Sequence, residues 1–145
     1  MKRMIALALT TLLLATGCGN SGAATSEAEE RYGSSTLKLY NWGEYMGEDL
    51  ISNFENEFGV KVILEYFDSN EMMYTKLQAG DAYDVLVPSD YMIERLIADG
   101  SLQELDLSLI PNMENLADGV KNLPYDPEHN YSIPYFWGNV GIVYN

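Results

Sequence analysis

Hydrophobic positions from residue 36 onward alternate between two kinds of spacing. Some runs have consecutive apolar residues or alternate them with polar ones, which is typical of β-strands. The expected strands are 37–40, 60–66 and 84–87. Other runs place apolar residues three or four positions apart, as on one face of a helix. The expected helices are 48–58, 69–79 and 90–99. Gly59, Gly80 and Gly100 follow these runs and are expected to end them.

The resulting βαβαβα order predicts an α/β fold with a mostly parallel sheet and helices on its faces, because parallel strands need crossover connections. Ligands of such sheets bind beyond the carboxyl ends of the strands. The loops expected there are 42–45, 69–71 and 89–91. They carry acids, aromatic rings and small polar side chains, and no basic residue. This composition suits a cationic, partly apolar ligand, since carboxylates accept bonds from ammonium groups and aromatic faces attract cations.

The same loops have a purely structural interpretation. Acids and serines directly after strands are common helix caps, so Glu48, Asp68, Ser69 and Asp90 are equally explained as caps, with Glu71 completing a capping box. Tyr91 can simply pack at the start of its helix. Trp42 precedes an acid and a tyrosine at the tip of a strand. Tryptophan is a poor helix cap, and this favours a ligand role for it.

The N-terminus has the features of a bacterial lipoprotein precursor. Lys2 and Arg3 precede an apolar run over 4–15 that is too short to span a bilayer and is typical of a signal peptide. The residues Ala15-Thr16-Gly17-Cys18 resemble a lipobox, although leucine is usual where Ala15 stands. We therefore expect a signal peptide over 1–17, a lipid anchor on Cys18 and a flexible tether to residue 35. The alternative is an ordinary signal peptide that is cut elsewhere.

Composition excludes several functional classes. The 145 residues include 22 acidic and 8 basic side chains, for a net charge of -14. Nucleic acid is therefore not expected as a partner, since phosphates need clustered Lys and Arg. Cys18 is the single cysteine, so an intrachain disulfide or a cysteine metal cluster cannot form.

Four motifs, in order along the chain, resemble the spermidine/putrescine-binding proteins of bacterial ABC importers. They are Leu39-Tyr40-Asn41-Trp42 with Glu44-Tyr45, Asp68-Ser69-Asn70-Glu71 with Lys76-Leu77, Tyr83 to Ser89, and Ser132-Ile133-Pro134-Tyr135 with Trp137-Gly138. The resemblance implies a two-lobed, type II periplasmic-binding-protein-like fold that closes around a polyamine and delivers it to a permease. Residues 36–145 would form the first lobe up to the hinge crossing, with the second lobe largely missing. It further implies a monomer on the outer face of the cell membrane.

The resemblance also assigns roles to individual residues. Trp42 and Tyr45 would be aromatic walls of the cleft, Glu44 an acid for an amine, and Ser89 and Tyr91 cleft residues on the opposite loop. Asn70 and Glu71 would support the cleft floor. Two positions depart from the family: Gly43 stands where a hydroxyl residue is common, and Asp90 adds an acid. Either departure can change the preference between putrescine and spermidine. Trp137 is expected to pack in the core or to contact ligand.

The remaining chain carries little chemistry. Residues 102–123 predict short turns, and 133–135 and 140–144 predict strands. The segment 125–131 holds His129, the single histidine, with Asp126 and Glu128, and a solvated turn is favoured there over a metal site.

Two other functions stay open from the sequence. The chain can bind another cationic solute, such as thiamine or a quaternary amine. Glu44 and Asp90 can also form the carboxylate pair of a glycoside hydrolase. No Ser-His-Asp set, cysteine nucleophile or metal cluster supports catalysis, so we expect a binding protein without cofactors. We further expect residues 1–145 alone to bind polyamine no more tightly than about millimolar, because exposed ion pairs contribute at most about 1 kcal/mol each.

Overall fold

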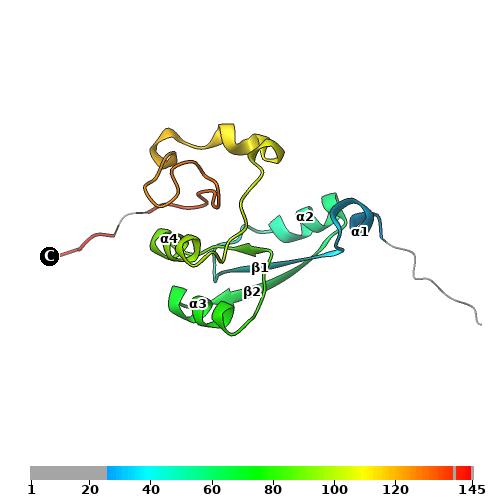
Figure 1. Cartoon of the computed structure of the whole chain (residues 1–145), viewed down its shortest axis with the longest axis horizontal. Helices are drawn as coiled ribbons and strands as arrows, with labels where there is room; N and C mark the ends of the chain where they lie inside the picture. The colour runs from blue at the N-terminus through cyan, green and yellow to red at the C-terminus, as the bar shows by residue number, and fades with distance from the viewer. Residues whose placement is uncertain (1–25, 139, 145) are drawn as a thin grey trace, which may run out of the picture.

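A computed structural model of the chain describes residues 26–138 and 140–144. The predicted signal peptide, the lipid anchor at Cys18 and the first part of the tether lie outside these residues. The described chain begins with a short helix, continues as three strands that alternate with three helices, and ends in a mostly irregular segment (Figure 1).

The sheet has three parallel strands in the order β2-β1-β3. They are β1 (Thr36–Trp42), β2 (Lys61–Phe67) and β3 (Val85–Leu86). β1 is central: it pairs with β2 along its whole length, from Thr36↔Lys61 to Trp42↔Phe67, and with β3 at two positions. The predicted parallel α/β architecture is confirmed. The third strand is shorter than the predicted 84–87.

The helices follow the predicted order, and the cap predicted at Ser69 is confirmed, whereas the caps of the other two helices differ from the prediction. α2 (Leu50–Phe58) starts two residues later than expected, because Asp49 adopts a left-handed conformation with φ 59° and makes no capping bond. α3 (Asn70–Gln78) is capped by Ser69, whose Oγ accepts from Met72 N at 3.1 Å. The cap predicted at Asp90 is wrong, since α4 (Asp90–Ala98) has Ser89 at its N-cap position. Gly59 ends α2 as predicted, with φ 66°.

The core joins β1 and β2 to α3 and α4. Tyr40 and Phe67 from the two strands meet edge to face, with ring centroids 4.9 Å apart. Met73 from α3 and Met92 and Leu96 from α4 complete the buried cluster. Each of these five side chains is at most 2% exposed, so the strand–helix connections are fixed by burial of large apolar side chains. This holds the loops at the carboxyl edge of the sheet on a packed base.

Part of the predicted flexible tether is helical. α1 (Glu27–Tyr32) begins after Ser26, whose side chain accepts from Glu29 N, and ends at Gly33 with φ 75°. Ala28 is buried, and the Tyr32 ring meets the Phe58 ring edge to face at 6.3 Å. The prediction of a flexible coil is therefore wrong for these residues. Ser26 and Glu29 have the spacing of a capping box, which is the signal for this helix in the sequence.

The chain after α4 forms short 3-10 turns, as predicted for 102–123. They are η1 (Leu107–Leu109), η2 (Pro111–Asn115) and η3 (Asp118–Val120). The strands predicted at 133–135 and 140–144 are wrong: the described residues there form no strand. A strand needs a hydrogen-bonding neighbour, and Ile142 and Val143 instead lie almost fully exposed. None of the helices in the described ranges has the length and apolar character needed to cross a membrane.

The turn predicted at 125–131 forms, with Pro127 and Glu128 exposed, but Asp126 and His129 are buried and not solvated as predicted. Burial alone would raise the pKa of Asp126, but bonds from Ser132 and from the backbone of 130–132 outweigh it and hold the pKa below its ordinary value. The Asp126 carboxylate therefore organises this loop. Among the described residues, no group of three or more His, Cys, Asp or Glu side chains is placed to hold a metal ion.

Candidate ligand-binding site

The loops after the three strands meet at the carboxyl edge of the sheet. β1 is the middle strand, so its loop leaves the sheet between those of β2 and β3. The outer loops are joined directly, because Asn70 at the start of α3 contacts both Ser89 and Tyr91 at the start of α4. The predicted convergence of these loops thus has a physical link.

Asn70 lies at the centre of this link and is only 4% exposed. Its Nδ2 donates to Ser89 Oγ at 3.0 Å and to Tyr91 OH at 2.8 Å, and its Oδ1 accepts from Ser89 N at 3.0 Å. Tyr91 OH in turn donates to Glu71 Oε1 at 3.0 Å. The structure brings together four predicted site residues, and it gives Glu71 a tyrosine partner in place of the predicted capping box.

The loop after β1 presents aromatic side chains and one acid. Trp42 is half-buried, with its ring 4.5 Å from Phe67 and 6.2 Å from Tyr45 between centroids. Glu44 is exposed and has a left-handed backbone, φ 64°, a conformation that is uncommon for residues other than glycine and asparagine. A Cβ atom at Gly43 would meet nothing within 4 Å. Packing therefore does not explain why glycine stands at this position, where the resemblance leads one to expect a hydroxyl residue.

The C-terminal segment reaches this same loop. Tyr135 OH donates to the Tyr45 carbonyl at 2.7 Å, and the Phe136 ring lies edge to face on the Tyr45 ring at 5.3 Å. Tyr45 itself keeps 41% of its surface exposed. Trp137 is 73% exposed, so the alternative that it packs in the core is wrong. Segments about 90 residues apart in sequence therefore share one aromatic surface.

Asn41 was not predicted as a site residue, although it directly precedes Trp42 at the end of β1. Its side chain is fully buried, with Oδ1 accepting from Trp42 N at 2.8 Å. Its Nδ2 has no hydrogen-bond partner within the described chain. Its position next to a tryptophan at a strand end was the feature of the sequence that could have singled out Asn41. In the structure, the Asn41 side chain holds the backbone of Trp42.

We call the exposed acids and the exposed or half-buried aromatic rings of the three loops the strand-end cluster. Its members are Trp42, Glu44, Tyr45, Glu71, Asp90 and Tyr91. Asp90 is exposed, and its Oδ1 accepts from Tyr91 N at 2.7 Å. In the part of the chain that the structure describes, none of the three acids of this cluster forms an ion pair.

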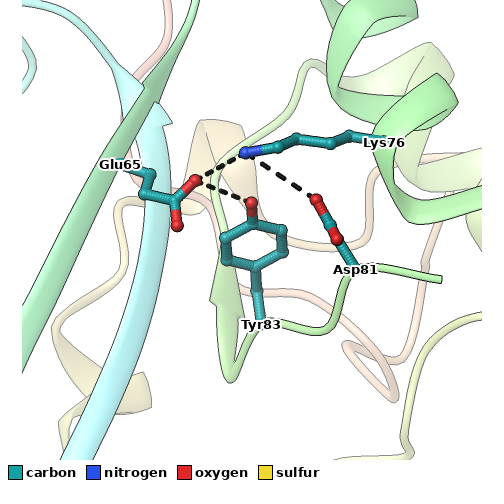
Figure 2. Close-up of polar contacts among 4 residues, drawn as sticks. All are labelled: Glu65, Lys76, Asp81 and Tyr83. Atoms are coloured by element: carbon teal, nitrogen blue, oxygen red, sulfur yellow. Dashed lines mark hydrogen bonds and ion pairs between the residues drawn. The ribbon is translucent and has the colours of Figure 1, made fainter. Parts of the chain in front are cut away.

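A second group of acids and rings lies beside the core, and no functional role was predicted for it. We call it the Lys76 cluster: Tyr40, Glu65, Lys76, Asp81 and Tyr83. Figure 2 shows the Lys76 ammonium between two carboxylates, 2.6 Å from Glu65 Oε2 and 3.8 Å from Asp81 Oδ2. Tyr83 OH also donates to Glu65 Oε2, at 2.8 Å (Figure 2).

Aromatic faces complete the surroundings of this ammonium. The Tyr40 and Tyr83 rings stack at 4.4 Å, and Lys76 Nζ lies 5.1 Å and 5.6 Å from their centroids. The bond from Lys76, followed by that from Tyr83, lowers the pKa of Glu65. The bond to Glu65 raises the pKa of Lys76 above its ordinary value. Both groups are therefore held in their charged forms.

Two cavities of the described chain lie away from the strand ends. One, of about 330 Å³, is lined by residues of α4 and the 125–131 loop, and the other, of about 250 Å³, lies between α1, α2 and the start of β1. Burial, then the charges of Asp90 and Asp126, raises the pKa of Tyr125 beside the first. No member of the strand-end cluster lines either cavity. Five of the six members of the cluster are exposed, and Trp42 is half-buried, so the cluster lies on the surface of the described chain.

Comparisons with known proteins agree with this arrangement. The family model described as bacterial extracellular solute-binding protein matches residues 49–145. The spermidine/putrescine-binding periplasmic protein of Escherichia coli strain K12 is 40% identical over 135 residues, covering 92% of this chain and 38% of its own length.

Solved structures give the same result. A putative spermidine/putrescine ABC transporter protein from Listeria monocytogenes is 46% identical, with a TM-score of 0.70 over 72% of this chain and 33% of its own. The TpPotD lipoprotein of Treponema pallidum is 38% identical, with a TM-score of 0.66 over 70% of this chain and 32% of its own.

These comparisons confirm the fold and the resemblance that the four motifs indicated. The chain spans about 38% of the length of the first curated relative that it matches. The family model covers more than half of the chain. The matched part begins at the start of α2 and includes the loops 69–71 and 89–91. The chain therefore belongs to the bacterial extracellular solute-binding protein family.

Proposed function

We propose that the chain provides one side of a polyamine-binding site in an extracytoplasmic protein that serves an ABC importer. The observation that carries the proposal is the strand-end cluster, in which three acids without ion pairs in the described chain adjoin three exposed or half-buried aromatic rings. Such a surface matches a ligand that alternates ammonium groups with methylene segments. The names of the relatives, which mention spermidine and putrescine, support this choice of cation.

Each member of the cluster has a role in this proposal. Trp42 and Tyr45 stack on the methylene segments, and Glu44 accepts hydrogen bonds from an ammonium group. Ser89 and Tyr91 contact the ligand from the loop after β3. Gly43, Asn70, Glu71, Asp90 and Trp137 adjoin or support the site. None of these residues is assigned a catalytic role, and the binding proposed here uses no cofactor or metal.

The proposal includes a second lobe that closes over this surface. An ammonium–carboxylate bond gains strength when water is excluded, and an open surface of exposed acids provides little affinity. Residues 36–145 supply one lobe in this account, and a monomeric two-lobed protein encloses the polyamine and presents it to the permease. The length of the curated relative supports this division.

We further propose that residues 1–17 are a lipoprotein signal peptide and that acylated Cys18 holds the protein at the outer face of the cell membrane. The description of the Treponema relative as a lipoprotein supports this. Cys18→Ala is expected to move the protein from the membrane fraction to the medium, or to leave an uncleaved precursor. Correctly processed protein that stays in the membrane fraction of the Cys18→Ala strain would contradict the anchor.

Calorimetric titration of the proposed two-lobed protein, in which residues 36–145 form one lobe and which we call the full-length protein, tests the function. We expect putrescine or spermidine to bind with a dissociation constant of about micromolar, and 1,4-butanediol, which lacks the charges of putrescine, to give no heat. Thiamine, choline and a set of oligosaccharides complete the panel. Tighter binding of thiamine or choline than of either polyamine would replace the ligand in this account. Binding of an oligosaccharide alone would contradict a cation site.

A further inference from the structure

The amide of Asn70 is fully engaged with protein groups. Each of its N–H and C=O groups can be assigned a partner: Ser89 Oγ and Tyr91 OH accept from Nδ2, and Oδ1 accepts from the Ser89 backbone N–H. The partners lie 19 and 21 residues away in sequence, in the loop that follows a different strand. An ammonium ligand only donates hydrogen bonds, so Asn70 Nδ2 cannot bind it. Oδ1 already accepts from Ser89 N–H and belongs to a residue that is only 4% exposed, which leaves a ligand little access to it.

The bonds of Asn70 determine what Ser89 and Tyr91 can offer. The Tyr91 hydroxyl accepts from Asn70 and donates to Glu71, so it is held from both sides. About half of the Tyr91 side chain remains exposed, at 51%, which leaves ring surface for a ligand while the hydroxyl is engaged. Ser89 Oγ receives one hydrogen bond from Asn70 and keeps a second lone pair for an ammonium group.

The Ser89 backbone N–H depends on the same amide. It donates to Asn70 Oδ1 at 3.0 Å, and Ser89 occupies the N-cap position of α4 without a side-chain capping bond. The side chain that would ordinarily cap this helix is therefore directed to Asn70 instead. Loss of the Asn70 side chain would release the backbone and the hydroxyl of Ser89 together.

We propose that Asn70 is a positioning residue that holds Ser89 and Tyr91 in the arrangement that binds the cation, without contacting the ligand itself. The inference rests on the proposed function. Pre-organisation of this kind improves affinity, because no binding free energy is used to order the loop when the ligand arrives. The polarity of the amide matters as well as its size, because a carboxylate at position 70 could accept from Ser89 N–H but could not donate to the two hydroxyl groups.

Two variants of the full-length protein test this proposal by putrescine calorimetry. Asn70→Ala is expected to weaken binding about fivefold or more. Asn70→Asp adds a negative charge near the site, which by itself would tighten binding of a dication. If Asn70→Asp nevertheless binds more weakly, the cause is the loss of the two N–H groups that donate to Ser89 and Tyr91. We expect a loss of about threefold or more. The matched control is Asn53→Ala, an exposed asparagine on α2, with affinity equal to that of the wild type.

A double-mutant cycle and hydrogen exchange separate positioning from general destabilisation. In a Tyr91→Phe background, Asn70→Ala should cost less affinity than in the wild type, because one of its targets is already absent. In ligand-free Asn70→Ala, the Ser89 amide should exchange about tenfold faster or more, while amides of the buried part of α4, such as Leu96, stay protected.

The outcomes distinguish this proposal from the proposed function. Wild-type protein that binds no polyamine overturns the function and the positioning role with it. Wild-type protein that binds, with Asn70→Ala and Asn70→Asp variants that bind as tightly or tighter, overturns only the positioning role. Equal costs of Asn70→Ala in the presence and absence of the Tyr91 hydroxyl would show that Asn70 does not act through Tyr91.

Discussion

The chain contains two groups of acids and aromatic rings, and they differ in whether a cation of the chain occupies them. The Lys76 cluster surrounds an ammonium with Glu65, Asp81 and Tyr83 (Figure 2), and the Tyr40 ring also lies beside this ammonium. The strand-end cluster has the same residue types, yet within the described chain none of its acids has an ion-pair partner. The acids of one cluster already hold a lysine of the chain, and those of the other have no ion-pair partner among the described residues.

The comparison shows how the same chemistry serves two purposes. A lysine that is fixed beside the core links α3 to β2 and to the segment before β3, so the Lys76 cluster supports the packed base. At the strand ends, the ammonium of the proposed ligand would come from outside the described chain. The Lys76 cluster is therefore an internal example of the geometry by which carboxylates and rings can hold an alkylammonium group, and it makes a matched control for the strand-end cluster.

The largest expected effect separates the two clusters by their acids. Glu44→Gln should weaken putrescine binding of the full-length protein about ten- to a hundredfold, since a charge-assisted bond in a closed cleft is lost. It should also reduce the salt dependence of binding, with little change in the thermal midpoint. Glu65→Gln, the matched change in the Lys76 cluster, should do the reverse and lower the midpoint at nearly unchanged affinity. Calorimetry that finds equal affinity losses in both variants would remove the distinction.

A smaller effect is expected from the aromatic side. Trp42→Leu should weaken binding about three- to thirtyfold, because a cation–π contribution of about 0.5 to 2 kcal/mol is lost. The salt dependence should stay unchanged, since no charge is removed. Tyr66→Leu, which alters an exposed ring on β2, is the control and should bind as the wild type does. Wild-type affinity in Trp42→Leu would place the ligand away from this loop.

Asp90 is expected to contribute less than Glu44. It is exposed and already accepts a bond from the backbone of its own helix. Exposed ion pairs contribute about 0.2 to 1 kcal/mol, so Asp90→Asn should weaken putrescine binding less than about fivefold. A change in the ratio of putrescine to spermidine affinity in this variant would identify Asp90 as a specificity determinant. A loss as large as that of Glu44→Gln would contradict the ranking.

The smallest effect on affinity, and a distinct pH dependence of stability, is expected for Lys76→Met. The pKa of Glu65 is lowered, so its stabilising contribution is present above its ordinary value of 4.5 and is lost as the pH falls through the lowered value. The pKa of Lys76 is raised, so its contribution is present below its ordinary value of 10.5 and is lost as the pH rises through the raised value.

The difference in unfolding free energy between wild type and Lys76→Met should therefore be constant from about pH 5 to about pH 10 and shrink in stronger acid. Chemical denaturation at a series of pH values measures it. Lys121→Met, which removes an exposed pair with Asp118 next to η3, is the control and should show little difference at any pH. A difference that persists undiminished at the lowest pH would mean that lost packing, rather than the ion pair, explains the effect of Lys76→Met.

Sequence pattern predicted the repeating elements well, because burial of alternating apolar residues determines them. It failed where side chains choose between local and distant partners. The cap of α4 was predicted at Asp90, but the N-cap position is Ser89, whose Oγ bonds to Asn70 and makes no capping bond. No local pattern reveals this distant partner. The C-terminal residues 140–144 are mostly apolar, and three of them are β-branched, yet they form no strand among the described residues, because strand formation depends on a neighbour.

The two clusters were not equally accessible to prediction. The strand-end cluster follows from topology alone, since parallel strands direct their loops to one edge. The contacts of the Lys76 cluster join residues 11 and 18 positions apart on a strand, a helix and a loop. Their meeting depends on the packing of Tyr40 against Tyr83 and on the placement of α3 over the core. Residue type alone could not show that one acid already holds a lysine while another is available to a ligand.

A crystal structure of the full-length protein with putrescine would test the central claim most directly. We predict that one ammonium nitrogen lies within hydrogen-bond distance of the Glu44 carboxylate and that the methylene chain packs against Trp42. Lys76 should keep its contact with Glu65. A diamine bound elsewhere, with the strand-end acids still facing solvent, would contradict the claim that the open cluster is the cation site.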